Sequence, residues 1–271
     1  MNKKTRTILF ASCILLFLLA APGVVLYSQG YRFDFEQKII TKTGAFYCRV
    51  LPKDAGVYID SKLIRKTAMF SNSALLENIL PKKYEFKISK EGYYSWQKTL
   101  EVKESRVTEA KYVVLFPLEV ELQEVAAETE KAEILLKMNL KEEKEMPKNL
   151  ADFIFNDFAV SSDNKKIAFY TDNEIRIFFT ENHYDLWKSA GDIAFLTRFS
   201  EKINQVFWLD DYHLLLSVGE SVKITEIDER DKPNIVNLLE LKNPKLYWDK
   251  NNKTAYILSQ DVLYKISNLL P

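Results

Sequence analysis

The N-terminus carries one long uncharged run. Residues 8–27 read ILFASCILLFLLAAPGVVLY and contain no ionisable side chain apart from a cysteine and a tyrosine. A helix of this length rises roughly 30 Å at about 1.5 Å per residue, which matches the hydrocarbon core of a bilayer. The run therefore predicts a transmembrane helix, and the rest of the chain must fold as a separate body.

Charges beside this run predict its orientation. Lys3, Lys4 and Arg6 precede it, and the first acidic residue is Asp34. Because Lys and Arg are enriched on the cytoplasmic side of a span, residues 1–7 are expected in the cytoplasm and the C-terminal body outside it. Such a short cytoplasmic segment argues against a transmembrane sensor. We predict a single-pass protein of the cell membrane.

Two other interpretations of the N-terminus stay open. A cleaved signal peptide has an apolar stretch of about 7–15 residues and an A-x-A-like end. Here the run is longer, and the pair Ala20-Ala21 is followed by Pro22. A lipoprotein signal ending at Cys13 would have almost no apolar stretch before it. The pattern favours an uncleaved anchor.

Composition excludes several classes of protein. The chain has 38 basic and 38 acidic residues, and without the three N-terminal cations the remainder is slightly acidic, so no nucleic-acid partner is expected. Its 7 glycines are too far apart for a nucleotide-binding loop. With 2 Cys and 2 His, neither a disulfide framework nor a Cys/His zinc site is expected. Cys48 is predicted to be a buried thiol or to form an intermolecular disulfide.

After a linker at residues 28–43, apolar residues recur with a period of two, which is typical of strands with one buried face. In 84–90 apolar and charged residues alternate strictly. Turn residues such as Pro52 and Gly92 separate such segments. We predict a small antiparallel β-sandwich over residues 44–118, with strands near 45–51, 57–60, 84–90, 93–102 and 109–115.

Three signals follow one another in this module. They are the turn Pro52-Lys53-Asp54-Ala55, the segment Val57-Tyr58-Ile59-Asp60, and Leu80-Pro81 followed by Tyr84-x-Phe86-x-Ile88-x-Lys90-x-Gly92-Tyr93. In this order they resemble the PEGA domain of bacterial and archaeal surface proteins. Asp54 and Ser61 stand where that family usually has Gly. The resemblance implies a non-catalytic sandwich in an envelope-anchored protein, with a binding or spacer role.

Aromatic residues cluster in one predicted strand of this sandwich. Tyr94 and Trp96 should share one face, and Tyr93 should take the other. The three side chains either fill the core and cover its rim or form a contact surface for a ligand or partner. They are the candidate contact residues of the sequence.

Residues 119–150 form an acidic linker in which Glu outnumbers Lys. Good helix formers occupy 123–140, so a helix is expected, although 134–140 would also suit a strand. We interpret the segment as a helix or spacer.

Residues 151–271 contain a repeat. Three passes begin near Phe158, Val206 and Leu246, at spacings of roughly 40–50 residues, and each supplies short strands in the manner of a β-propeller blade. The segment 160–169 resembles a turn of TolB-type propellers, with Asn164 in the usual Gly place. Asp163, Asp210 and Asp249 recur as hairpin residues rather than metal ligands.

Three passes are fewer than the roughly four to eight blades of a closed propeller. Residues 119–150 supply further strands, or the ring is incomplete, or a partner completes it. We favour a partial or degenerate propeller. The predicted fold is therefore mainly β, with a transmembrane helix, a PEGA-like sandwich and this propeller-like domain.

No catalytic motif is present in the sequence. His183 is expected in an insertion, and His213 on a strand, facing solvent or pairing across the sheet. We therefore predict no enzyme, catalytic residue, cofactor or metal. The predicted function is that of a non-catalytic, membrane-anchored extracytoplasmic binding or scaffold protein of the cell envelope. The alternative is a subunit or regulator of an envelope enzyme complex, with a site on the propeller-like face. Expected partners are the membrane and an envelope protein or a polysaccharide, while the oligomeric state is not predicted.

Overall fold

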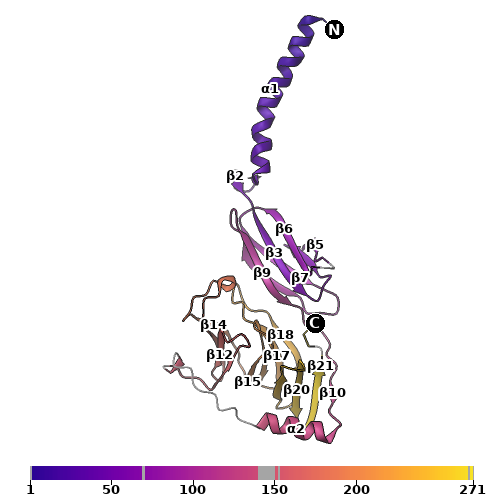
Figure 1. Cartoon of the computed structure of the whole chain (residues 1–271), viewed down its shortest axis with the longest axis vertical. Coiled ribbons are helices and arrows are strands. Elements are labelled where there is room, and N and C mark those ends of the chain that lie inside the picture. The colour runs from indigo at the N-terminus through magenta and orange to yellow at the C-terminus, as the bar shows by residue number, and fades with distance from the viewer. Residues whose placement is uncertain (1, 69–70, 140–149, 152, 268, 271) are drawn as a thin grey trace.

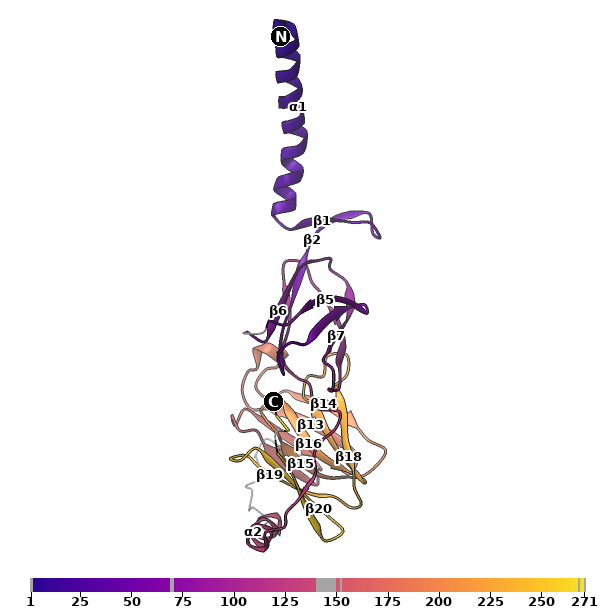
Figure 2. The same cartoon turned by 90° about the vertical axis from the view of Figure 1, so that its right-hand side faces the viewer.

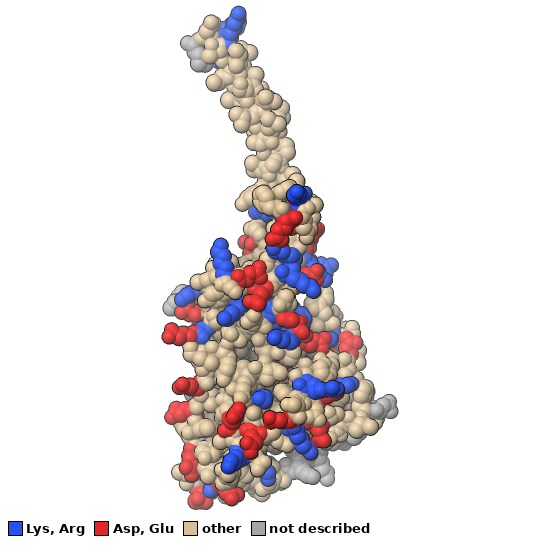
Figure 3. Space-filling model, turned by 180° about the vertical axis from the view of Figure 1, so that it is seen from behind, with Lys and Arg blue, Asp and Glu red and all other residues tan. Residues whose placement is uncertain are grey.

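A computed structural model describes the chain except residues 1, 69–70, 140–149, 152, 268 and 271. Helix α1 (Lys3–Ser28) stands apart from the body, with no residue buried, and is long and apolar enough to cross a membrane. It contains the predicted span 8–27 and extends one turn further toward the N-terminus. In Figure 3 its surface is free of charged side chains between the basic N-terminal end and the body.

A two-stranded hairpin follows directly where a linker was expected. Strands β1 (Tyr31–Asp34) and β2 (Ile39–Lys42) pair antiparallel. Figure 2 shows this hairpin extending sideways between the end of α1 and the first β module.

The first module is a sandwich of two sheets. One sheet has the order β6-β3-β9 and the other β5-β4-β7-β8. Their strands are β3 (Gly44–Leu51), β4 (Gly56–Ile59), β5 (Lys62–Lys66), β6 (Ser73–Ile79), β7 (Lys83–Ser89), β8 (Trp96–Glu101) and β9 (Val107–Val114). Phe46 and Phe86 stack across the core with ring centroids 3.9 Å apart.

The prediction of an antiparallel sandwich is wrong for one sheet, because β3 and β9 pair in parallel. Side-chain alternation has the same period in both pairings, so the sequence pattern carries no information about strand direction. The strands β5 and β6 were not anticipated. All five positions of β5 are exposed, so that strand has no buried face to produce a pattern.

Three four-stranded sheets, which we call blades 1 to 3, follow in the described residues. Blade 1 has the order β11-β12-β13-β14, blade 2 β15-β16-β17-β18, and blade 3 β10-β21-β20-β19. The strands are β10 (Gln123–Glu124), β11 (Asp157–Val160), β12 (Lys166–Tyr170), β13 (Glu174–Phe179), β14 (Ile193–Arg198), β15 (Ile203–Trp208), β16 (His213–Val218), β17 (Ser221–Glu226), β18 (Ile235–Glu240), β19 (Lys245–Asp249), β20 (Thr254–Ser259) and β21 (Val262–Ser267).

The predicted repeat is confirmed by this arrangement. Phe158, Val206 and Leu246 all lie on an edge strand of their own blade, and these edge strands lie side by side, β11 against β15 and β15 against β19. The blades do not close into a ring within the described residues, as the prediction of a partial propeller requires.

The acidic linker contributes structure to blade 3 and to blade 1, which lie at the two ends of the row of blades. It supplies β10, which completes blade 3 by pairing with β21, and the helix α2 (Glu128–Asn139), whose Ile134 packs with Tyr256 and Leu263. At its other end Leu150 packs on Phe158 and Phe169 of blade 1. The predicted helix is therefore confirmed. The explanation that residues 119–150 supply further strands to the propeller-like module holds for one strand, β10. Residues 140–149 of the predicted linker lie outside the described residues.

Candidate functional site

The two β modules meet along the edge strand β8 of the sandwich. Positions along β8 alternate between buried and exposed, and Trp96, Lys98 and Leu100 share the buried face. Opposite them lies the connection between β17 and β18 of blade 2. We call this contact the junction; it is formed by Trp96, Lys98, Glu109, Lys111 and Tyr112 of the sandwich and by Asp185, Tyr212, Glu226, Asp228, Arg230 and Asn234 of the blades.

Lys98 is the central cation of the junction and has no exposed surface. Its ammonium donates to the backbone carbonyls of Asp228, Arg230 and Lys232 at 2.7, 2.8 and 2.7 Å, and lies 3.0 Å from a Glu226 carboxylate oxygen. An ammonium can donate three hydrogen bonds, so these four acceptors satisfy it fully. The arrangement fixes the course of the β17–β18 connection around a side chain of the other module.

Glu226 holds the opposite charge and is also buried. Its Oε2 accepts from the Trp96 indole nitrogen at 2.9 Å, and its Oε1 accepts from the backbone and side-chain nitrogens of Asn234 at 2.9 and 2.7 Å. A buried carboxylate is tolerated only when it is paired and hydrogen-bonded, and here both requirements are met.

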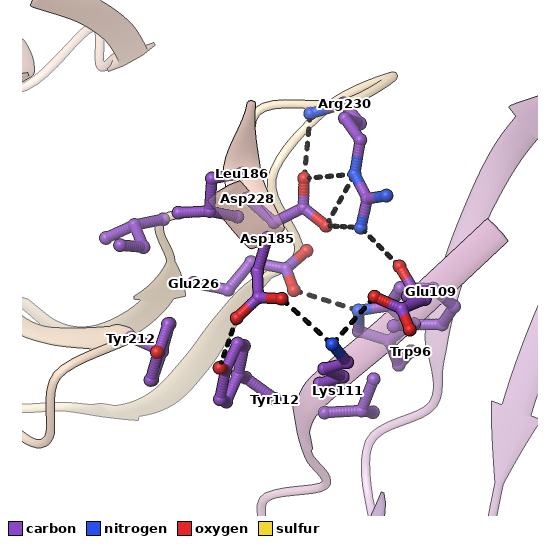
Figure 4. A pocket seen from close by; sticks show the side chains of 13 residues that line it. Trp96, Glu109, Lys111, Tyr112, Asp185, Leu186, Tyr212, Glu226, Asp228 and Arg230 are labelled. Carbon is purple, nitrogen blue, oxygen red and sulfur yellow. Dashed lines mark hydrogen bonds and ion pairs between the residues drawn. The ribbon is translucent and has the colours of Figure 1, made fainter. Parts of the chain in front are cut away.

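A cleft opens beside this buried pair, with about 410 Å³ of empty space that includes open solvent at its mouth (Figure 4). On one wall the rings of Tyr112 and Tyr212 stack with centroids 3.4 Å apart. Asp185, from the loop after β13, accepts from the Tyr112 hydroxyl at 2.7 Å and lies 2.9 Å from the Lys111 ammonium. Lys111 also contacts Glu109 at 2.7 Å. Blade 1 is thereby tied to strand β9 of the sandwich.

The surroundings favour the charged forms of Asp185 and Lys111 and the neutral forms of the two tyrosines. Burial works against ionised Asp185, but hydrogen bonds from Lys111 and Tyr112 outweigh it and lower the pKa of this carboxyl below its usual range. Hydrogen bonds to Glu109 and Asp185 raise the pKa of Lys111. Burial raises the pKa of Tyr112 and of Tyr212, so both phenols stay protonated and able to donate.

The opposite wall carries a second ion pair. Asp228 and Arg230 form a two-pronged contact with distances of 2.6 and 2.9 Å, and Arg230 also donates to the Glu109 carbonyl at 2.9 Å. Burial opposes ionisation of Asp228, but the Arg230 hydrogen bond prevails and lowers its pKa. The buried and half-buried acids that line the cleft are thus each bonded to a cation or another donor. These bonds hold the two modules together. The described residues contain no group of three or more His, Cys, Asp or Glu that could hold a metal ion.

The three sequence candidates lie at or beside this junction. Trp96 is buried and donates to Glu226; Tyr94 is half-buried and donates to the Asn237 carbonyl of blade 2 at 2.8 Å. Tyr93 packs on the sandwich core and forms a β-bridge with Pro117. Tyr94 and Trp96 contact the chain's own second module, and the role of all three side chains toward an external ligand stays a prediction.

The turn acids behave as hairpin residues. Asp163 accepts from the backbone nitrogen of Lys165, Asp210 from that of Tyr212, and Asp249 from those of Asn251 and Asn252. Each side chain closes a turn two residues on, which is the common use of Asp in loops.

The expectation for His213 is wrong, since its ring is buried and lies 2.9 Å from an Asp210 oxygen. Phe116, which follows the sandwich, covers it edge-on. His183 lies in the loop after β13, as expected. Cys48 is fully buried, and burial raises the pKa of its thiol to about 12, as the buried-thiol alternative requires.

Lys98, Asp185 and Arg230 were not singled out from the sequence. For Lys98 a signal exists, because it occupies the same face of its strand as Trp96 and Leu100. A charge on an apolar face indicates a buried partner. Asp185 and Arg230 lie in connections whose course depends on the packing of the two modules, and no local pattern marks them.

No protein-family model matches the chain, and no curated protein matches its sequence, so the PEGA resemblance stays a prediction. Among solved structures, the chain is similar to the β-propeller domain of Cps50 (Swd1) from Myceliophteria_thermophila, with 9% identity and a TM-score of 0.32 over 68% of this chain and 67% of that one. It is also similar to YCF48 from Cyanidioschyzon merolae, with 15% identity and a TM-score of 0.28 over 68% of this chain and 47% of that one. A third similar structure is Hsv2 from Kluyvelomyces marxianus, with 12% identity and a TM-score of 0.26 over 81% of this chain and 56% of that one. The chain spans about half the length of the last two. The propeller-like description of this module rests on its own strand order.

Proposed function

We propose that this protein is a non-catalytic binding or scaffold protein of the cell envelope, anchored by α1 and carrying its two β modules outside the cytoplasm. The length and apolarity of α1 support the anchor, and Lys3, Lys4 and Arg6 support the orientation. The PEGA-like order of turns in the sandwich belongs to the same proposal.

A pair of exposed aromatic side chains carries the binding role. Tyr184 is 82% exposed and Trp187 is 75% exposed, on the loop after β13. Large aromatic side chains dominate the binding energy of many protein interfaces, and exposing two of them on one short loop is unfavourable unless something covers them.

The loop that carries them is held firmly. Asp185 bonds to Lys111 and Tyr112 of the sandwich, and Lys188 pairs with Glu229 of the β17–β18 connection. A fixed loop loses little conformational entropy on binding, which favours a recognition role. We propose that an envelope protein, or else a polysaccharide, contacts Tyr184 and Trp187.

The test uses the full-length chain in its own membrane, with a photo-crosslinking residue at Trp187. The matched control carries the same residue at Leu136, which is 63% exposed, on the helix α2 at the end of the body opposite α1. We expect a discrete adduct from position 187 that is lost when Tyr184→Ala is added. Equal adducts from both positions, or none from 187, would contradict the proposed surface. Digestion by a glycosidase or by a protease identifies the chemistry of the adduct.

A further inference from the structure

The β1–β2 hairpin is amphipathic. Opposed residues of an antiparallel pair place their side chains on the same face, so the pairs Phe33–Ile40 and Tyr31–Lys42 define one face, whereas Arg32–Thr41 and Asp34–Ile39 define the other. Toward the turn, the first face is apolar and open to solvent. Phe33 is 46% exposed, Ile40 is 60% exposed and the turn residue Phe35 is 83% exposed. Phe33 and Phe35 contact each other edge-to-face at 5.0 Å.

The second face rests on the body. Asp34 and Thr41 of this face are buried; Asp34 accepts from the backbone nitrogens of Glu36 and Gln37 in its own turn, and Thr41 donates to Glu104 in the β8–β9 turn. Arg32 donates to the Asn78 side chain of β6 at 2.7 Å. Because this face is turned toward the sandwich, the apolar face is turned away from it. Figure 2 shows α1 and the sandwich on opposite sides of the hairpin.

The hairpin is also fixed to the end of α1. The Arg32 guanidinium donates to the Tyr27 carbonyl at 2.8 Å and lies 3.6 Å above the Tyr27 ring. Thr43 donates twice to the Gly30 carbonyl, from its backbone nitrogen and its hydroxyl, each at 3.0 Å. The hairpin therefore cannot drift from the point where the apolar helix ends.

From these contacts we infer that the hairpin is a membrane-interface element, which inserts Phe33, Phe35 and Ile40 into the outer leaflet of the bilayer that α1 crosses. The inference rests on the proposed anchoring by α1. Since the uncharged run ends at Tyr27, an α1 that spans the bilayer places that ring at the lipid headgroups, where Tyr is enriched. Strand β1 begins a few residues later, so its apolar face meets the acyl boundary and not water.

The surrounding side chains suit this position. Lys38 stands in the hairpin turn, and Lys42 lies 5.2 Å from the Tyr31 ring on the apolar face. Long cationic side chains at this depth extend their ammonium groups to lipid phosphates while their stems cover apolar surface. An apolar face bounded by lysines is what a phospholipid interface accommodates.

Nitroxide labels on the full-length chain in phospholipid vesicles test the inference. The background carries Cys13→Ala, and Cys48 stays because it is buried. Single cysteines replace Phe35, Ile40, Ile39 and Leu136 in turn, and a further one replaces Val24 in α1. Ile40 and Ile39 form a matched pair, being the same residue type on opposite faces of one strand. Collision with oxygen, which concentrates in lipid, is compared with collision with a water-soluble nickel complex.

We expect the labels at Phe35 and Ile40 to collide with oxygen several-fold more than with nickel, at a depth of roughly 5–10 Å below the headgroup boundary. Labels at Ile39 and Leu136 should show the reverse. If Val24 is in lipid while Phe35 and Ile40 report water, the hairpin inference is overturned and the anchor survives. If Val24 also reports water, the anchor fails as well. Protection of Phe35 and Ile40 from both reagents would mean a protein contact and would overturn the inference too.

Discussion

Lys98 and Glu226 form a buried ion pair across the boundary between two β modules, with nitrogen and oxygen 3.0 Å apart and side-chain exposures of 0% and 8%. The pair belongs to a set that also includes three backbone carbonyls and the Trp96 indole. Burying one module's cation inside the other module's loop makes the two modules depend on each other for stability.

The substitution Lys98→Met tests that dependence. It leaves the buried Glu226 carboxylate without its cation and three carbonyls without their donor, which should lower the free energy of unfolding by about 3–5 kcal/mol. Lys62→Met, at an exposed position of β5, is the control and should change it by less than about 0.5 kcal/mol. Denaturant unfolding in detergent measures both. Equal effects of the two substitutions would show that Lys98 does not hold the junction.

A second prediction concerns pH and His183. Burial lowers the pKa of this imidazole, whose Nδ1 has no hydrogen-bond partner in the described structure. The unfolded chain takes up a proton near pH 6.5, where the folded chain does not, so stability falls as pH drops below about 6.5. His183→Phe keeps the edge contacts with Phe179 and Tyr212 but cannot be protonated. Unfolding between pH 5 and 8 should be less pH-dependent in this variant, and an unchanged slope would refute the assignment.

The contribution of α2 to the stability of blade 3 can be tested with two substitutions in this helix. Ile134 is 3% exposed and packs on blade 3, whereas Leu136 is 63% exposed. Ile134→Ala should lower the free energy of unfolding by about 2–5 kcal/mol, because it leaves a cavity over Tyr256 and Leu263. Leu136→Ala should leave it nearly unchanged. If both variants unfold alike, α2 does not stabilise the third blade.

Topology can be read from two engineered cysteines. The native Cys13 lies in the apolar helix and Cys48 is buried, so the unmodified chain serves as its own background. With a membrane-impermeant maleimide on right-side-out vesicles, Ser200→Cys should react, whereas Asn2→Cys should react only after permeabilisation. The opposite pattern would place the body in the cytoplasm.

The sequence predicted what depends on local periodicity and turn chemistry. The three Asp-bearing turns recur because each hairpin needs the same backbone bonds, and the alternating segment 84–90 gave strand β7 to within one residue. Pairings between distant segments were not predictable. Strand β10 has two residues, Gln123 and Glu124, and is a strand only because β21 offers an unpaired edge.

The same limit applies to the candidate site. Tyr94 and Trp96 were singled out as aromatic contact residues and do make contacts, but with the second module of their own chain. Their aromatic side chains indicated that this part of the sandwich surface would be covered. Only the packing of the modules shows what covers it, and Asp185 and Arg230 enter the junction from connections that have no periodic pattern.

The pairing of β10 with β21 has a consequence for biosynthesis. Blade 3 takes its outer strand from a segment that leaves the ribosome long before its partner, and Lys98 likewise waits for the carbonyls of Asp228, Arg230 and Lys232. Such distant contacts make folding slow, because a long loop must close before they form. The body therefore reaches its final state only once β21 has been made, and Trp96 and the edge of the sandwich stay uncovered until the β17–β18 connection has been made.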